Sequence, residues 1–250
     1  MLDTLALPNY TGSLGFGQSA VLRLIGKCGS LDVEDCMEAL RHIVGLGYAQ
    51  LGRGKVFIHG GSHGGFLGAH RKCSLSRSFD QDLRETIVVG QFPDVFTAAA
   101  LRNPVISVGE ISTSDIPDWF YAEFDIPYPI PMPSSPLGAG DDSTAAVKKG
   151  VHTTPTPSVY EKLYNASPIR LAEKVTADIL LLIGKDDLRV APTQGYAYYH
   201  TLKVLQCSRN SGNQRVEMLV FDGEAHPLEG VECARVGWEA SRAWFADASS

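Results

Sequence analysis

The sequence predicts an α/β fold in which helices flank a mostly parallel sheet. Apolar runs of strand length alternate along the chain with segments of helical periodicity. The runs are short and nearly continuous in apolar residues, as in strands buried on both faces of a parallel sheet. A length of 250 residues and an apolar fraction of 44% are typical of a globular chain with one large domain. We therefore expect a single domain over residues 1–250.

The first half of the chain contributes two expected helices and two expected strands. A helix is expected over 32–47, where six apolar residues share one face and Ser30 can act as the N-cap. The strand 55–59 (KVFIH) follows, and a glycine cluster separates it from a short helix over 66–70. The next buried strand is expected over 96–101 (FTAAAL).

The second half repeats the alternation of strands and helices. Strands are expected over 178–183 and 216–221, because both runs are mostly apolar and of strand length. A helix opened by Pro192 is expected over 193–205, and a closing helix over 231–246. Because the strands are separated by helices of crossover length, the sheet is expected to be parallel.

Two stretches interrupt this pattern. Residues 71–85 (RKCSLSRSFDQDLRE) are polar where the helix after the glycine cluster should continue, so we interpret them as a polar insertion. Residues 126–157 contain seven prolines among Gly, Ser, Thr and Ala, a composition that cannot bury enough apolar surface to become ordered. We expect this second stretch to be a flexible surface insertion within the same domain.

Composition excludes several classes of function. The net charge of −6 would repel a phosphate backbone, and no Lys/Arg-rich block offsets it, so nucleic acid is not an expected partner. The longest apolar run, 179–183, is far shorter than the roughly 20 residues of a membrane span, so no membrane association is expected. The first residues lack the features of a secretory signal, and five scattered cysteines lack a CxxC pair. These observations favour a cytoplasmic protein with reduced thiols and without a zinc site.

The strongest local signal is Gly60-Gly-Ser-His-Gly64, a Gly-x-Ser-x-Gly motif between an expected strand and an expected helix. This context is typical of the nucleophile elbow of the α/β-hydrolase fold, which presents the serine on a strained turn. Ser62 is then the nucleophile, and the backbone N–H of His63 is a donor for an oxyanion. A phosphate-binding loop is the alternative, but no Gly-Lys pair of the chain precedes Ser or Thr.

A nucleophilic serine needs a base, and the base needs an acid to orient it. In this fold the chain order is serine, acid, histidine, with the last two on loops after late strands. Asp186 and Asp187 follow the strand 178–183, and His226 follows the strand 216–221. Either aspartate can serve as the acid on this argument.

The other histidines fit the role of base less well. His59 is expected to be buried at the end of its strand, and His63 is expected to point away from the substrate side of Ser62. A metal held by His59, His63 and His70 is not expected, because the elbow already uses that turn.

Motifs over most of the chain extend this interpretation. They are Asn9-Tyr-Thr-Gly-Ser13, Gly15-Phe-Gly17, Gly60-Gly-Ser-His-Gly-Gly65, Arg102-Asn-Pro-Val105, Ser114-Asp-Ile-Pro-Asp-Trp119, Ser167-Pro-Ile-Arg170, the segment Gly184 to Pro192 with Gln194-Gly195, and Glu224-Ala-His-Pro-Leu228. With these residues the chain resembles the catalytic domain of the acylaminoacyl-peptidases, within the prolyl oligopeptidase family of serine peptidases.

The resemblance implies roles for individual residues. It assigns the nucleophile to Ser62, the acid to Asp187 and the base to His226. Asp187 is assigned rather than Asp186, because the family's aspartate precedes a basic residue and a Val-Pro-like segment. It implies release of N-acylated amino acids from short peptides in the cytosol, without a cofactor, by an enzyme that is a homo-oligomer in many members. Arg102 and Trp119 are candidates for substrate contact or for packing, with neither favoured.

The resemblance also implies differences from this chain. Family members carry a β-propeller and further strands before this domain, so we expect an N-terminally truncated domain. The loop that would supply a second oxyanion donor precedes the matching region, so we expect the chain alone to be weakly active or inactive. Two rival functions stay open: an esterase or dipeptidyl peptidase of the same fold, and a catalytically silent chain that binds a partner.

Overall fold

The computed structural model describes residues 4–70, 95–113, 115–116, 119–126, 156–209 and 214–249. The polar insertion expected at 71–85 lies outside the described residues, as does nearly all of the flexible insertion expected at 126–157. Of the second stretch, Ile126 is only 7% exposed, and Pro157 is the first residue of a helix.

Four parallel strands form the sheet, in the order β1-β2-β3-β4. They are β1 (Phe57–Gly61), β2 (Ala98–Arg102), β3 (Asp178–Gly184) and β4 (Val216–Phe221). The register aligns their carboxyl ends: Gly61 pairs with Arg102, and Gly184 pairs with Phe221. Because the strands are parallel and in register, the loops that follow them meet at one edge of the sheet. The prediction of an α/β fold with a parallel sheet is confirmed.

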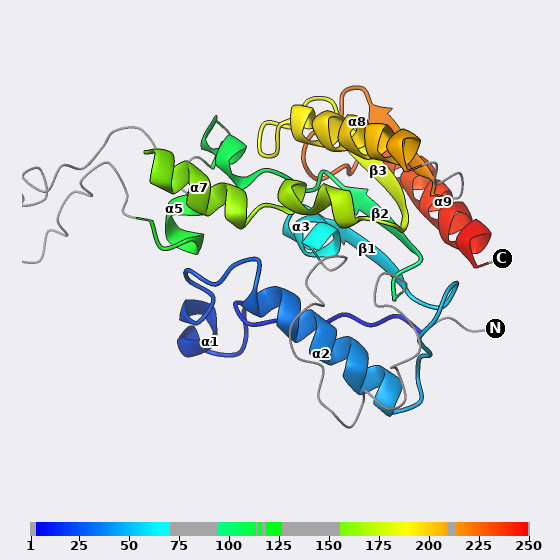
Figure 1. Ribbon diagram of the computed structural model, residues 1–250, viewed down its shortest axis with the longest axis horizontal. Coiled ribbons are helices and arrows are strands. Elements are labelled where there is room, and N and C mark those ends of the chain that lie inside the picture. Colours follow the sequence, from blue (N-terminus) through cyan, green and yellow to red (C-terminus); the bar gives the residue numbers. More distant parts are fainter. Residues whose placement is uncertain are drawn as a thin grey trace, which may run out of the picture.

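Helices cover both faces of the sheet. Their bounds are α1 (Gln18–Leu22), α2 (Leu31–Gly45), α3 (His63–His70), η2 (Val108–Thr113), α5 (Trp119–Glu123), α7 (Pro157–Asn165), η3 (Pro168–Lys174), α8 (Pro192–Ser208) and α9 (Val231–Ala248). Helices α2, α3 and α8 lie along one face, and α9 covers the other (Figure 1). None of the helices in the described ranges has the length and apolar character needed to cross a membrane.

Alternation along the central strands divides the core into two layers. Ala99 and Leu101 of β2 face α2, α3 and α8, where Tyr198 of α8 is fully buried. Ala98 and Ala100 face α9 and pack with Trp244. Successive side chains of a strand point to opposite faces, so an uninterrupted apolar run is what a sheet covered on both sides requires.

A third apolar cluster lies apart from the sheet core. It joins α2 and the turn before it to α3, η2, α5 and α7, and its fully buried members include Val33, Phe66, Phe120 and Leu163. Helices α1, η2, α5, α7 and η3 were not predicted from the sequence, because they are short, with at most 9 residues. A signal was present for α7: Thr156 accepts a hydrogen bond from the Val159 N–H (3.4 Å), and Pro157 follows at the first helical position.

Three expectations need correction around the glycine turn. His59 is exposed rather than buried: Ile58 faces the core layer of α2 and α3, and on the other side of β1 it is Phe57, not His59, that packs against α9. Helix α3 begins at His63 rather than at residue 66, so it starts directly after Ser62. Ser30 occupies the N-cap position of α2, but its hydroxyl donates to the Lys27 carbonyl (2.7 Å) and caps no helix N–H.

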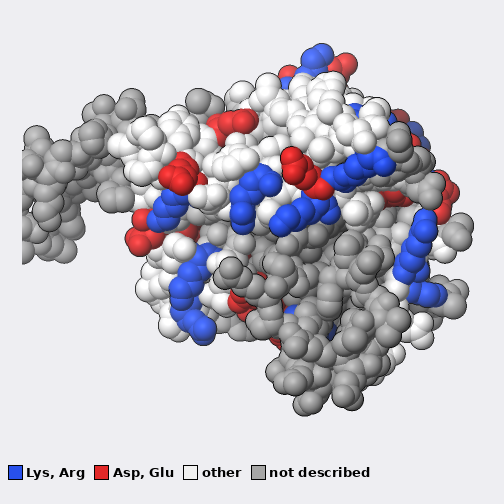
Figure 2. Space-filling view, viewed as in Figure 1, with Lys and Arg blue, Asp and Glu red and all other residues white. Residues whose placement is uncertain are grey.

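Charged side chains are mixed on the face shown in Figure 2. Lys and Arg side chains stand near Asp and Glu side chains and are separated by uncharged surface. The described part of this face therefore presents no continuous basic surface, in keeping with the net charge of −6.

The buried His70 makes the stability of the fold depend on pH. Its side chain is nearly inaccessible and packs on Phe66, with ring centroids 4.1 Å apart, and burial lowers its pKa from 6.5 to about 4. The unfolded chain therefore takes up a proton that the folded chain excludes, so stability is lost as the pH falls from about 6.5 toward 4. The loss is about 3 kcal/mol at most.

We expect the urea midpoint of unfolding to fall less between about pH 7.5 and about pH 4.5 in His70→Gln than in the unchanged chain. His42→Gln is the matched control, since His42 is exposed on α2. Equal pH dependence of all three proteins would contradict the assignment to His70.

Candidate active site

Ser62 occupies a strained turn between β1 and α3. Its φ is +52°, a region that non-glycine residues rarely adopt. The neighbouring glycines are required by space: a Cβ at Gly60 would collide with the carbonyl of Gly64, and one at Gly65 would lie 2.6 Å from Pro104 Cβ. This is the backbone geometry of a nucleophile elbow.

Backbone hydrogen bonds hold the turn at the edge of the sheet. The Ser62 N–H donates to the carbonyl of Arg102 (2.9 Å), and the Phe66 N–H donates to the Ser62 carbonyl (3.0 Å). His63 is the first residue of α3, so its N–H has no acceptor within the helix. Donors at the start of a helix attract negative charge, which suits an oxyanion.

The acid and base predicted from chain order lie in contact. His226 Nδ1 is 2.7 Å from Asp187 Oδ2, between the loops after β4 and β3. The other oxygen of Asp187 accepts the N–H groups of Arg189 (2.8 Å) and Val190 (2.9 Å). Asp187 is 3% exposed, whereas Asp186 is exposed to solvent and its backbone N–H donates to the Glu224 carbonyl.

This geometry determines which imidazole nitrogen is basic. An ionised carboxylate only accepts hydrogen bonds, so Nδ1 of His226 carries the proton in this contact and Nε2 carries the lone pair. Between the described residues Ser62 and His226 the structure shows no direct hydrogen bond. Such contacts are often long in a free enzyme and shorten when substrate binds.

The end of β2 contacts the three segments that carry Ser62, Asp187 and His226. The side chain of Asn103 accepts the Gly184 N–H (2.8 Å) and donates to the His226 carbonyl (2.9 Å). Its backbone N–H donates to the Leu182 carbonyl (2.9 Å), and its φ is +38°. Asn103 is 3% exposed, so its amide is a buried link between the acid loop and the histidine loop. It belongs to the Arg-Asn-Pro segment of the sequence motif, but no role was predicted for it.

Arg102 and Trp119 lie close to the predicted site and contact the protein itself. The Arg102 guanidinium donates to the carbonyls of Pro227 (2.6 Å) and Leu228 (3.3 Å), directly after His226. Trp119 begins α5 and presents its ring edge-on to His63, with centroids 6.4 Å apart. A contact of either side chain with substrate stays a prediction.

The side chain of His63 turns toward α2 and joins a buried polar cluster. Its Nε2 is 2.9 Å from Asp32 Oδ2, and Cys28 Sγ is 3.7 Å from the same oxygen. Burial, and then the charge of Asp32, raises the pKa of the adjacent Tyr10 to about 12. Burial also raises the pKa of the Cys28 thiol. Among the described residues this is where three potential metal ligands converge; His59, His63 and His70 do not.

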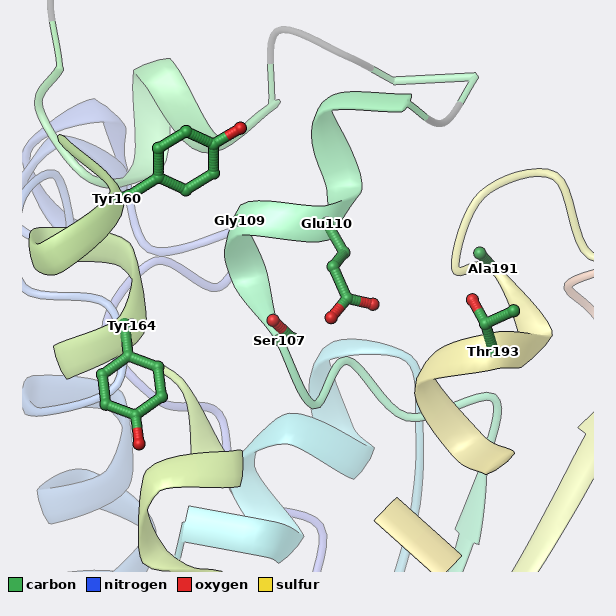
Figure 3. A pocket seen from close by; sticks show the side chains of 7 residues that line it. All are labelled: Ser107, Gly109, Glu110, Tyr160, Tyr164, Ala191 and Thr193. Carbon is green, nitrogen blue, oxygen red and sulfur yellow. The ribbon is translucent and has the colours of Figure 1, made fainter. Parts of the chain in front are cut away.

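A cavity of about 620 Å³ lies to one side of these residues, and none of the predicted site residues lines it. Tyr160 and Tyr164 extend into it from α7, and Thr193 faces it from the start of α8, across from Glu110 (Figure 3).

Solved structures share this fold. A Mycobacterium tuberculosis puromycin-hydrolyzing peptidase superposes with a TM-score of 0.66 at 22% identity, over 97% of this chain and 29% of that one. A Pyrococcus horikoshii acylaminoacyl peptidase superposes with a TM-score of 0.58 at 21% identity, over 87% of this chain and 27% of that one. The fold is therefore the α/β-hydrolase fold of such peptidases.

Sequence comparison gives the closer relationship. The acylamino-acid-releasing enzyme of Arabidopsis thaliana is 34% identical over 240 residues, which are 95% of this chain and 25% of the plant protein. The chain thus spans about a quarter of the length of the curated relatives that it matches. A sequence model described as "Prolyl oligopeptidase family" matches residues 4–70 and 139–249. The chain belongs to the prolyl oligopeptidase family.

Proposed function

We propose that this chain carries the catalytic machinery of a serine peptidase that releases N-acylated amino acids from the amino end of short peptides. The observation that carries the proposal is the buried Asp187–His226 pair, held at the same sheet edge as the strained Ser62 turn. The substrate class is supported by the 34% identity to an acylamino-acid-releasing enzyme.

Ser62 Oγ attacks the carbonyl of the acylated residue, and His226 Nε2 takes the hydroxyl proton. Asp187 stabilises the imidazolium through the 2.7 Å contact at Nδ1. The His63 N–H donates to the oxyanion of the tetrahedral intermediate. His226 then protonates the leaving amine and the C–N bond breaks, which leaves an acyl-enzyme ester on Ser62.

Deacylation repeats these steps with water as the nucleophile. His226 Nε2 removes a proton from water, the hydroxide adds to the ester, and the proton returns to Ser62 Oγ as the N-acyl-amino acid leaves. Every proton transfer is carried by His226, so the proposed reaction needs no cofactor.

The same proposal includes a reducing, cytoplasmic location. Its support is that none of the described cysteines, which are Cys28, Cys36, Cys207 and Cys233, forms a disulfide.

Labelling with a fluorophosphonate tests whether Ser62 is an activated nucleophile. We expect the unchanged chain to be labelled and Ser62→Ala not to be. Turnover of acetyl-alanyl-nitroanilide, compared with a dipeptidyl-nitroanilide and a short ester, tests the substrate class. If the chain is labelled but turns over the dipeptidyl or ester substrate faster, the proposed substrate class is wrong. If the chain is not labelled, the result supports a catalytically silent chain.

Substitutions in the three loops should follow the roles assigned above. We expect Ser62→Ala and His226→Ala each to lower kcat by about 10⁴-fold or more, and Asp187→Asn by about 10²–10⁴-fold. Asp186→Asn is the matched control and should have little effect, because that carboxylate is exposed. A larger loss of kcat in Asp186→Asn than in Asp187→Asn would show that the acid is misassigned.

Asn103 should support catalysis by positioning the loop of His226. Removing its amide leaves the buried Gly184 N–H without an acceptor, which costs about 1–3 kcal/mol. It also frees the His226 backbone, so we expect fluorophosphonate labelling to slow by ~10- to 100-fold. Asn103→Gly tolerates the positive φ and Asn103→Ala does not, so the pair separates backbone strain from loss of the amide.

The measurements for this pair are the urea midpoint and the labelling rate. Asn165→Ala is the control, because Asn165 is an exposed residue at the end of α7. If Asn103→Gly is less stable but is labelled at the normal rate, then Asn103 contributes to folding and not to the position of His226.

A further inference from the structure

We propose that Cys28, Asp32 and His63 form a binding site for a soft divalent cation such as Zn²⁺, and that its occupation slows the reaction of Ser62. The effect on Ser62 rests on the proposed function above, whereas binding of the cation does not. The site lies behind the nucleophile turn, on the side facing α2, and is separate from the Asp187–His226 pair.

The geometry already approaches that of a tetrahedral metal site. One sulfur, one carboxylate oxygen and one imidazole nitrogen all lie within 4.8 Å of one another. Cys28 Sγ is 3.7 Å from Asp32 Oδ2, and His63 Nε2 is 2.9 Å from the same oxygen. Around tetrahedral zinc, the usual bond lengths place a sulfur ligand about 3.6 Å from an oxygen ligand, and a nitrogen ligand about 3.4 Å from an oxygen ligand. The S···O separation fits as it stands, and the imidazole would withdraw by about half an ångström.

The surrounding backbone orients the carboxylate for this role. Asp32 Oδ1 accepts the Gly29 N–H (2.8 Å) and the Val33 N–H (2.9 Å), which leaves Oδ2 directed at Cys28 and His63. Hydrogen bonds that fix a ligand in this way are typical of protein metal sites and raise their affinity.

The ligand types select the cation. Thiolate, imidazole and carboxylate together suit Zn²⁺, whereas Mg²⁺ and Ca²⁺ prefer oxygen ligands alone. On binding, the Cys28 thiol releases its proton to solvent. The imidazole of His63 gives up the Nε2 proton that it donates to Asp32 before the cation binds and carries its one proton on Nδ1, so the Nε2 lone pair is free to bind the cation. Thiolate and carboxylate then carry two negative charges against the two positive charges of the cation, so the filled site is neutral.

Access to the cluster is restricted. Asp32 is fully buried and Cys28 is 6% exposed, whereas the side chain of His63 is 23% exposed. The rings of Tyr10, Phe66 and Trp119 lie around the imidazole, with centroids 5.7, 5.1 and 6.4 Å away. A cation can therefore enter beside His63 and, once bound, is shielded from water by apolar groups.

The coupling to catalysis follows from the position of His63 in the chain. It directly follows Ser62 and is the first residue of α3, and its N–H is the oxyanion donor assigned above. A cation that displaces its ring shifts the peptide on which that donor sits. Since loss of one such donor costs ~10²–10³ in kcat, we expect a partial misalignment to slow the reaction by about 10-fold.

Cobalt reports on thiolate ligation directly, because a Co²⁺–thiolate bond absorbs in the near ultraviolet. We expect titration of the chain with Co²⁺ to produce this band and Zn²⁺ to abolish it by displacement. Cys233→Ser is the matched control, because Cys233 is also 6% exposed but lies in α9, on the opposite face of the sheet. The band should persist in Cys233→Ser and disappear in Cys28→Ser.

Fluorophosphonate labelling measures the coupling in the same three proteins. Zn²⁺ should slow labelling by about 10-fold in the unchanged chain and in Cys233→Ser, and Cys28→Ser should need ~10-fold or more Zn²⁺ for the same effect. Asp32→Asn gives a second test of the site and should also need more Zn²⁺ for the same effect. Its amide oxygen can keep both backbone hydrogen bonds, but the negative charge is lost. Circular dichroism spectra like that of the unchanged chain establish that the variants fold.

The outcomes separate the site from the proposed function. Absence of a thiolate band, or a band that persists in Cys28→Ser, would overturn the metal site and leave the cluster as a hydrogen-bond network that holds His63. A band without any change in labelling would overturn the coupling to Ser62. If the unchanged chain is not labelled at all, the proposed function fails, whereas the cobalt titration still decides the site.

Discussion

The side-chain amide of Asn103 is the contact on which the arrangement of this site depends. An amide both donates and accepts, so one buried residue can join the N–H at the end of β3 to the carbonyl of His226. The preceding residue, Arg102, accepts the Ser62 N–H at its carbonyl and donates from its guanidinium to the loop after His226. Arg102 and Asn103, at the end of β2, thus hold the three loops that carry Ser62, Asp187 and His226, although these loops are far apart in sequence. A shift of that strand would move all of them together, which preserves their mutual geometry.

Local patterns were enough to predict much of the fold. Strand β4 was predicted with its observed bounds, and β3 to within one residue, because each is a mostly apolar run of strand length. The Ser62 turn could be recognised because its glycines, its strand and its helix are adjacent in the chain. The pairing of Asp187 with His226 was predicted from chain order and resemblance, and the structure brings these two residues together. His59 was misplaced, because its exposure depends on how far the helix on its side of β1 extends along the strand, and the sequence of one strand does not contain that information.

Other features depend on contacts between distant segments and had no local signal. The amide of Asn103 bonds groups that are 81 and 123 residues away. Asp32 and His63 meet because α2 packs beside α3, although nothing near Asp32 in sequence suggests a partner. The short helices α5 and α7 are stabilised by burying Phe120 and Leu163 in a common cluster, to which α2 and α3 also contribute. Features of this kind form because distant segments pack together, so the local sequence does not predict them.

The left-handed backbone of Ser62 has a consequence for how this sequence can change over generations. A serine with φ near +52° costs roughly 1–3 kcal/mol relative to a relaxed backbone, and glycine removes most of that cost. The position is therefore one where fold stability and chemical activity favour different residues. In a gene copy released from selection for hydrolysis, replacement of this serine by glycine would improve the stability of the protein. Loss of the nucleophile would then be an early and favourable step in the divergence of such a copy, rather than a late accident of neutral drift.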